Sequence, residues 1–430
     1  MSIGNKIDKA LIEGVFLEKT YVKIKKKISN FFKELFNGKL RKRVFARIDQ
    51  RLQERALLRM SNSIPVDENK IIFLMFSGDY ACNGKAICEE MLRQNIPYKL
   101  VWGIYNKQKG SLQYPYGVKL VVRGTYNFYR ELSSAKIIID NGISTAHLKY
   151  HKKPNQILIE TWHGSLGIKK FSPSSNNDKK WVKKCFKEAA MTDYIISNSS
   201  FEDDIYREDY WKKAEIWQYG HARNDILFQK EKWSKIHDEI CIRYGIPGEN
   251  KICLYAPTFR DNGDFSPYCI DYDSLRDALT ERFGGEWSIL IKFHYRILKK
   301  TEKYKFPDSV INVSDYPDIQ ELMACTDVGI TDYSSWICEF FLTRRPTFIF
   351  AADSDSYIGK ERDFFFPLEE LPSPVSYDVK TLLHLIKSFD EELYIKRCNE
   401  FLLDKGSIDD GHASERIVNK IREIMEDNQK

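Results

Sequence analysis

A short hydroxyl-rich turn, Thr331-Asp332-Tyr333-Ser334-Ser335, lies between two apolar stretches of the chain. Residues 327–330 before it have the pattern of a short buried strand, and residues 336–341 after it have that of a helix. Such a turn places hydroxyls and backbone N–H groups at the start of a helix, where phosphate is stabilised. Asp332 or Ser334 could instead serve only as the cap of that helix. The turn alone leaves both interpretations open.

Four more polar clusters have a related placement in the chain. They are Trp162-His163-Gly164, Thr258-Phe259-Arg260-Asp261, His294 and Asp410-Gly411. The first three stand just past an apolar run that has the pattern of a strand. In open α/β sheets, ligands bind outside the carboxyl ends of the strands. Because this placement repeats, the sequence predicts that the clusters converge on one ligand site.

Together these segments resemble the CDP-glycerol glycerophosphotransferase family of teichoic-acid and capsule assembly. The resemblance rests on Thr161-Trp162-His163-Gly164, residues 255–261, His294, residues 315–322, residues 330–335 and Asp410-Gly411, within roughly residues 140–420. It implies an α/β, GT-B-like fold with two Rossmann-like domains facing a central cleft. It also implies transfer of a polyol phosphate from a CDP-linked donor to a hydroxyl group.

Three positions depart from the pattern of that family. Ser165-Leu166 stands where Thr-Pro is frequent, Tyr295 stands where a proline is frequent, and Glu339 stands where an aspartate is common. These departures leave the expected activity in place. They leave open whether the polyol is glycerol or ribitol, and which acceptor is used.

Two histidines are the expected catalytic residues. An acceptor hydroxyl attacks phosphorus only as its proton is removed, and His163 can take that proton because imidazole titrates near neutral pH. His294 would act on the donor side, where negative charge builds on the departing CMP. The alternative for His163 is a histidine that only hydrogen-bonds its own loop.

The expected donor-binding residues are Thr258, Arg260, Asp332, Ser334, Ser335 and Glu339. Arginine presents a planar fork of donors that suits phosphate. Glu339 lies four residues after Ser335, hence on the same helix face, where its carboxylate could accept both ribose hydroxyls of the cytidine. Structural alternatives stand beside these roles: Arg260 could pair with Asp261 or Asp264, and Glu339 could be a plain surface carboxylate.

Acceptor or phosphate contacts near His163 are expected from Trp162, Gly164, Lys169 and Lys170, with solvated lysines as the alternative reading of the last two. No Asp-x-Asp motif and no His/Cys cluster of ligand spacing is present. The sequence therefore predicts no metal cofactor, and it leaves open a magnesium ion held loosely on the donor diphosphate.

Composition predicts the compartment. The nine cysteines are scattered without Cys-x-x-Cys spacing, and several, such as Cys253, lie inside apolar runs, as small buried side chains do in a reducing compartment. No apolar stretch approaches the roughly 18–20 residues that span a bilayer, and Met1 begins no signal-peptide pattern. We expect a cytoplasmic chain that does not cross a membrane.

The charge is distributed unevenly along the chain. Residues 1–60 hold 16 Lys or Arg and 6 Asp or Glu, a net of +10, whereas the whole chain carries +6. Lysines of this segment alternate with Phe31, Phe32 and Phe36. A basic amphipathic segment suits the surface of an anionic membrane, although a solvated helix packed on the core remains the alternative. No nucleic-acid recognition module is visible.

Length and element pattern predict about two domains. Strand patterns alternate with helix patterns, which argues for parallel α/β layers. We expect a basic membrane-associating segment over residues 1–62 and an acceptor domain over residues 63–235. A CDP-donor domain with C-terminal helices, packing back across the domains, is expected over residues 236–430. The chain gives no clear signal of oligomeric state.

The predicted function is that of a membrane-surface transferase. It would move a polyol phosphate, with glycerol phosphate as the first choice, from a CDP-polyol to a lipid-linked saccharide or a polyol-phosphate chain, and release CMP. Two alternatives stay open from the sequence. A glycosyltransferase of the same fold would release a nucleoside diphosphate from a nucleotide-sugar, and a non-catalytic module would bind CDP-polyols or wall polymer without needing a base at His163.

Overall fold

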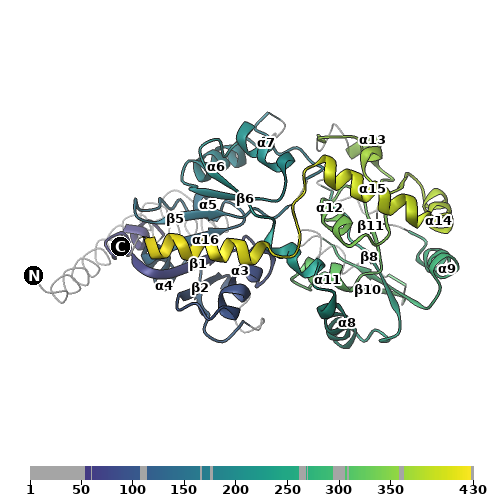
Figure 1. The fold of residues 1–430 in the computed structure, drawn as a ribbon, viewed down its shortest axis with the longest axis horizontal. Helices are drawn as coiled ribbons and strands as arrows, with labels where there is room; N and C mark the ends of the chain where they lie inside the picture. The colour runs from purple at the N-terminus through teal and green to yellow at the C-terminus, as the bar shows by residue number, and fades with distance from the viewer. Residues whose placement is uncertain are drawn as a thin grey trace, which may run out of the picture.

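The computed structural model describes residues 54–59, 61–106, 114–164, 167–174, 178–260, 268, 270–293, 306–307, 309–357 and 363–427. In these residues the chain forms two α/β units that lie side by side, each built on one parallel sheet (Figure 1). The α/β prediction is therefore confirmed. Most of the basic segment predicted for residues 1–62, and His294, lie outside the described residues.

The first unit contains a seven-stranded sheet with the order β3-β2-β1-β4-β5-β6-β7. Its strands are β1 (Asp67–Leu74), β2 (Lys99–Ile104), β3 (Lys119–Val122), β4 (Ala135–Asp140), β5 (Ile157–Glu160), β6 (Tyr194–Ser197) and β7 (Glu215–Gln218). The helices between them are α3 (Cys82–Arg93), α4 (Tyr126–Ser134), α5 (Ser144–His147), α6 (Lys179–Ala189) and α7 (Ser200–Glu208). All neighbouring strands pair in parallel.

The second unit contains a six-stranded parallel sheet with the order β10-β9-β8-β11-β12-β13. Its strands are β8 (Lys251–Tyr255), β9 (Trp287–Ile291), β10 (Val310–Asn312), β11 (Val328–Thr331), β12 (Thr347–Phe350) and β13 (Val375–Ser376). Its helices are α8 (Lys230–Tyr244), α9 (Tyr272–Phe283), α11 (Ile319–Cys325), α12 (Trp336–Phe340), α13 (Ser354–Tyr357), α14 (Val379–Lys387) and α15 (Glu391–Asp404). Short 3-10 turns are η4 (Phe341–Thr343) and η5 (Leu368–Glu370).

The central strands are buried along their whole length, because helices cover both faces of each sheet. All six residues of β4 and all five of β9 are buried. In parallel sheets covered on both faces, strands read as continuous hydrophobic runs rather than as alternating ones. This is why runs such as residues 251–255 could be assigned as strands from sequence. The very short strands β10 and β13 were not predicted.

The chain passes twice between the two units. The 3-10 segment η2 (Ala222–Leu227) leads from β7 to α8. The chain returns after α15 through residues 405–412 to α16 (Ala413–Asp427), which lies along α3 of the first unit (Figure 1). Four apolar residues of α16, Ile417, Val418, Ile421 and Met425, belong to the core of the first unit. The predicted domain boundaries themselves stay predictions.

In the described part of the chain, no helix combines the length and the apolar content needed to cross a bilayer.

Candidate active site

His163 lies in the loop after β5, at the carboxyl end of the first sheet. Its Nδ1 donates to the carbonyl oxygen of Asn141, 2.6 Å away in the loop after β4. Because a carbonyl oxygen only accepts, Nδ1 carries the proton and Nε2 is the acceptor. The rings of Phe76 and Trp162 pack against the imidazole with centroid distances of 4.8 and 4.6 Å. The imidazole is thus held in the tautomer that a general base requires.

Burial lowers the pKa of His163 to about 4. The hydrogen bond to Asn141 opposes this shift, and the positive charge of Arg223 adds to it. Taking a cationic imidazolium out of water is costly, so the neutral form dominates at pH 7. The neutral form is the one that can accept a proton from a hydroxyl.

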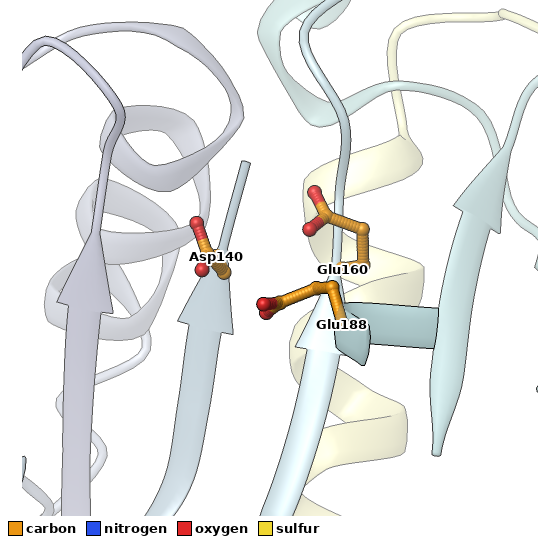
Figure 2. A group of neighbouring side chains, drawn as sticks. All are labelled: Asp140, Glu160 and Glu188. Atoms are coloured by element: carbon orange, nitrogen blue, oxygen red, sulfur yellow. The ribbon is translucent and has the colours of Figure 1, made fainter. Parts of the chain in front are cut away.

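Three buried carboxyl groups, Asp140, Glu160 and Glu188, gather at the carboxyl ends of β4 and β5 (Figure 2). Their oxygen atoms lie within 4.8 Å of one another. Burial raises the pKa of all three groups, and neighbouring carboxylates raise those of Glu160 and Glu188 further, that of Glu188 to about 8. Like charges this close cannot all ionise, so the cluster holds protons at neutral pH.

This carboxyl cluster holds the backbone of the two loops that meet at His163. Asp140 accepts N–H bonds from Gly142 and Thr145, Glu160 accepts one from Trp162 at 2.8 Å, and Glu188 accepts one from Ala146 at 2.6 Å. Trp162 needs such support, since its φ of 49° is unfavourable for a residue with a side chain. The cluster therefore stabilises the two loops that position His163.

The turn with Ser334 and Ser335 approaches the His163 loop from the second unit. A Cβ atom at Gly164 would lie 3.8 Å from Oγ of Ser335, so the two loops meet between the units. Both serines are half-buried. Helix α12 after the turn has only five residues, shorter than an effective macrodipole needs. The hydroxyls and N–H groups of the turn would therefore supply most of the attraction for an anion.

Arg260 is engaged within the protein rather than open to a phosphate. Its side chain is 3% exposed, and its guanidinium pairs with Asp353 through two contacts of 2.5 and 2.8 Å. Its Nη1 lies 2.8 Å from Asp332. Asp332 also accepts the N–H and hydroxyl of Thr258, at 2.8 and 3.0 Å. These contacts form a structural ion-pair network, in which Asp353 is a partner that the sequence did not suggest. Phosphate binding by Arg260 stays a prediction.

Glu339 is likewise engaged within the protein, and its contact with ribose stays a prediction. Its side chain is 1% exposed. One carboxylate oxygen pairs with Nη2 of Arg223, and the other accepts from the amide of Gln320 at 2.6 Å. The face of α12 that carries Glu339 is turned toward η2 and α11 instead of toward the serine turn. These contacts place Glu339 beside the site, between Arg223 and Gln320.

Arg223 joins the loops of the two units. Its Nη1 donates to the carbonyl oxygen of His163 at 2.7 Å while Nη2 holds Glu339 of α12. Its backbone N–H donates to Asn83, whose amide donates to the carbonyl oxygen of Thr161 at 3.0 Å. One guanidinium therefore sets the histidine loop against the helix after the serine turn. Arg223 was missed, although residues 220–225 follow β7 as the histidine loop follows β5.

The lysines after His163 lie where the two units touch. Lys169 forms an isolated antiparallel bridge with Phe364, and the N–H of Lys170 donates to the carbonyl oxygen of Asp363 at 2.8 Å. Ile168, in the same loop, is fully buried in the hydrophobic core of the second unit. Lys170 is exposed, and Lys169 lies over the ring of Tyr357 at 5.5 Å. Phosphate binding by either lysine stays a prediction, as does the role of His294.

The Asp410-Gly411 segment lies at the second crossing between the units. Asp410 pairs with Arg416 on the surface. Its neighbour Asp409 is buried and accepts from the N–H of His221 and the amide of Asn198, at 2.9 and 2.6 Å. This segment therefore fastens the returning chain to η2 rather than contributing a group to the serine turn.

Two parallel α/β units, with His163 on one and the Ser334-Ser335 turn on the other, define a two-sheet α/β protein whose candidate site lies between the sheets. The particular family follows from the sequence. The chain belongs to the CDP-Glycerol:Poly(glycerophosphate) glycerophosphotransferase family, whose sequence model matches residues 56–423.

Similar proteins agree with this membership. A teichoic acid poly(glycerol phosphate) polymerase of Staphylococcus epidermidis is 29% identical over 375 residues, which are 84% of this chain and 52% of the polymerase. A teichoic acid glycerol-phosphate transferase of Staphylococcus aureus is 28% identical over 371 residues, 83% of this chain and 93% of the transferase. This chain thus spans about half the length of the first relative.

Solved structures show the same arrangement of elements. A variant of the wall teichoic acid polymerase TagF with CDPG superposes with a TM-score of 0.75 at 27% identity, over 90% of this chain and 96% of that one. The TagF-like fold with two parallel sheets is therefore established for this chain.

Proposed function

We propose that this chain transfers glycerol phosphate, or a related polyol phosphate such as ribitol phosphate, from a CDP-polyol to a hydroxyl group. The acceptor is a lipid-linked saccharide or a polyol-phosphate chain of teichoic-acid or capsule-type synthesis. One observation carries the proposal: in a chain of the glycerophosphotransferase family, neutral His163 with its free acceptor nitrogen lies across from the Ser334-Ser335 turn. A structure of the similar polymerase TagF with CDPG supports this choice of donor.

The chemistry assigns one task to each side of the site. The acceptor hydroxyl attacks the distal phosphorus of the donor while Nε2 of His163 takes its proton. The phosphorus–oxygen bond to CMP breaks, and the bond electrons leave with the bridging oxygen. The hydroxyls of Ser334 and Ser335 donate to the phosphoryl oxygens as charge develops there, and His294 assists the leaving group. Phosphoryl transfer depends mainly on such positioning and electrostatic stabilisation.

The proposal requires no metal that stays with the protein. A magnesium ion would arrive with the donor diphosphate, if at all, and leave with CMP. Turnover measured with a chelator and with added magnesium tests this point. Magnesium that stays with the protein through gel filtration without donor, and that activity requires, would contradict the proposal.

The two units would act as the halves of a GT-B-like fold, with the acceptor on the first and the CDP-donor on the second. The +10 segment of residues 1–60 would hold the protein peripherally on the inner face of the cell membrane. Basic segments are attracted to anionic lipid there. A lipid-linked acceptor would then diffuse within reach of His163.

The decisive experiment identifies the nucleotide that is released. The full chain is incubated with a hydroxyl acceptor and with CDP-glycerol, CDP-ribitol or nucleotide-sugars in separate reactions. Release of CMP with incorporation of polyol phosphate supports the proposal. Release of a nucleoside diphosphate from a nucleotide-sugar would make the chain a glycosyltransferase, and tight CDP-glycerol binding without turnover would make it a binding module.

A further inference from the structure

Helix α6 (Lys179–Ala189) carries a row of lysines on the first unit. Lys180, Lys183, Lys184 and Lys187 are spaced i, i+3, i+4 and i+7, so they share one side of the helix. We call these four residues the α6 lysine face. Lys149 lies close enough to Lys187 to lower its pKa through charge repulsion, although burial is the larger cause.

Among the described residues, no carboxylate forms an ion pair with the α6 lysine face, although the adjacent Glu188 attracts Lys187. Within the described ranges, none of the four lysines of the α6 lysine face forms an ion pair, whereas lysines of α8, α14 and α15 do. Lys184 instead donates to Nδ1 of His147 at 2.9 Å. Burial lowers the pKa of His147, and the charge of Lys184 adds to this shift. Like charges at positions i and i+4 destabilise a helix. A helix with four lysines that form no ion pair fits a polyanionic partner.

A series of aromatic rings connects α6 to the histidine loop. Phe186 of α6 is 46% exposed and packs against Tyr210 with a centroid distance of 5.0 Å. Tyr210 stacks with Phe171 at 6.2 Å, and Phe171 stacks with Trp162 at 5.5 Å. Trp162 in turn packs on His163. Packed rings therefore connect α6 to the proposed acceptor side of the site, and α6 belongs to the same unit (Figure 1).

We propose that the α6 lysine face binds the phosphate backbone of a polyol-phosphate acceptor chain whose terminal hydroxyl reaches His163. This inference rests on the proposed function and specifies its acceptor. Ammonium groups suit phosphodiesters as mobile point charges, without the fixed geometry of an arginine fork. The face spans ~10 Å along the helix, so it contacts more than one phosphate of a linear polyanion.

The continuity with His163 favours the acceptor chain over a lipid surface. A growing chain that leaves the site must place its phosphates somewhere along the first unit. The aromatic series runs from His163 to Phe186 of α6, the helix that carries the lysines. A membrane, in contrast, would need no connection between the basic face and the base.

The test uses the full chain with three lysines reversed, Lys180→Glu, Lys183→Glu and Lys187→Glu together. The matched control reverses Lys235, Lys380 and Lys396, which are exposed on α8, α14 and α15 of the second unit. Both variants change the net charge equally. The probe is a fluorescently labelled oligo(glycerol phosphate) of several repeats, and its affinity is measured by anisotropy without donor.

We expect the α6 variant to bind the probe at least tenfold more weakly than the control, because several phosphate contacts turn repulsive. High salt should weaken probe binding by the unchanged protein. With CDP-glycerol present, KM for the oligomer should rise, and turnover on an acceptor analogue with a single phosphate should stay unchanged. Equal probe affinity in both variants would overturn the inference.

Two further measurements keep the outcome decisive. If the charge reversal unfolds the protein, the Lys→Gln triple variant replaces it, and an unchanged probe affinity there overturns the inference. Sedimentation with vesicles of anionic and neutral lipid forms the other arm: loss of vesicle binding with intact probe binding would assign the face to the membrane. Absence of CMP release by the unchanged protein would refute the proposed function. The anisotropy measurement would still show whether the α6 lysine face binds the oligomer, because it needs no donor.

Discussion

At the scale of single residues, the central finding is a histidine that is fixed in orientation and neutral. A base with a pKa of about 4 is weak, and a weak base removes a proton only late in the reaction. The phosphoryl group must therefore be well stabilised before the proton moves. A donor diphosphate close to His163 would raise the pKa of the imidazole, since negative charge favours the protonated ring.

His163→Ala should lower kcat by ~10²–10⁴-fold, the usual effect of losing a general base. The affinity for CDP-glycerol, measured by calorimetry, should stay within about twofold, because the histidine is on the acceptor side. His412→Ala is the matched control, since that histidine is exposed on the second crossing. A variant at position 163 with native kcat would remove this residue from the mechanism.

The pH dependence follows from the same histidine. Its pKa is lowered from 6.5 to about 4 in the free protein, so kcat/KM should hold as pH falls below 6.5 and be lost only toward pH 4. The acid limb of kcat, which reports the complex with donor, should lie at higher pH than the limb of kcat/KM. An acid limb of kcat/KM at pH 6.5 or above would show an unshifted histidine.

At the scale of elements, the site depends on loops that are tied to one another across the two sheets. The carboxyl cluster holds the loops after β4 and β5, and Arg223 of η2 fastens the second of these to α12. Buried ion pairs of this kind cost ~3–5 kcal/mol when one partner is removed. Glu339, for which a ligand role is predicted, is a member of this framework through Arg223.

Glu339→Gln therefore separates the two roles of this residue. If it positions α12, CMP affinity should stay near native while kcat falls and the protein loses stability on the order of 3 kcal/mol. Ser335→Ala, in contrast, should weaken CMP or CDP-glycerol binding about tenfold, the effect of losing one hydrogen bond to a charged group. A large loss of CMP affinity in Glu339→Gln would support the predicted contact between Glu339 and ribose.

Glu188→Gln tests the carboxyl cluster through stability. The pKa of Glu188 is raised from 4.5 to about 8, so its burial is favourable at low pH and becomes costly as pH rises from 4.5 through 8. Glutamine resembles the protonated form. The variant should match the native protein at pH 4.5 and exceed it at pH 8.5, by on the order of a few kcal/mol, in thermal unfolding. A constant difference across this range would contradict proton sharing in the cluster.

The positions of His163 and the serine turn could be predicted because strand patterns are local and their carboxyl ends mark a ligand edge. The partners of Arg260 and Glu339 could not, since Asp353 and Arg223 are 93 and 116 residues away in the chain. The periodicity of apolar residues in a sequence carries no information on pairs so far apart in the chain. Likewise the composition contained the acids Asp140, Glu160 and Glu188, but only the registry of β4 with β5 and the packing of α6 brings them together.

At the scale of the whole molecule, charge is separated along the chain. The +10 of residues 1–60 stands against a remainder of about −4. Reversing Lys25, Lys26 and Lys27 to Glu should lower sedimentation with anionic vesicles and lower turnover on vesicle-held acceptor. Each lysine near such a surface contributes ~1 kcal/mol. Turnover on a water-soluble acceptor should be unaffected, and equal binding to anionic and neutral vesicles by the native protein would refute the membrane role.

The return of α16 to the first unit has a consequence for biosynthesis. Domains usually mature in the order in which the ribosome delivers them. Here Ile417, Val418, Ile421 and Met425 complete the core around β1 and α3, so the first sheet stays unfinished until residues 413–427 have been translated. The nascent first unit would expose an apolar groove during synthesis of the entire second unit. A premature stop just before α16 would therefore damage the half of the protein that was made first.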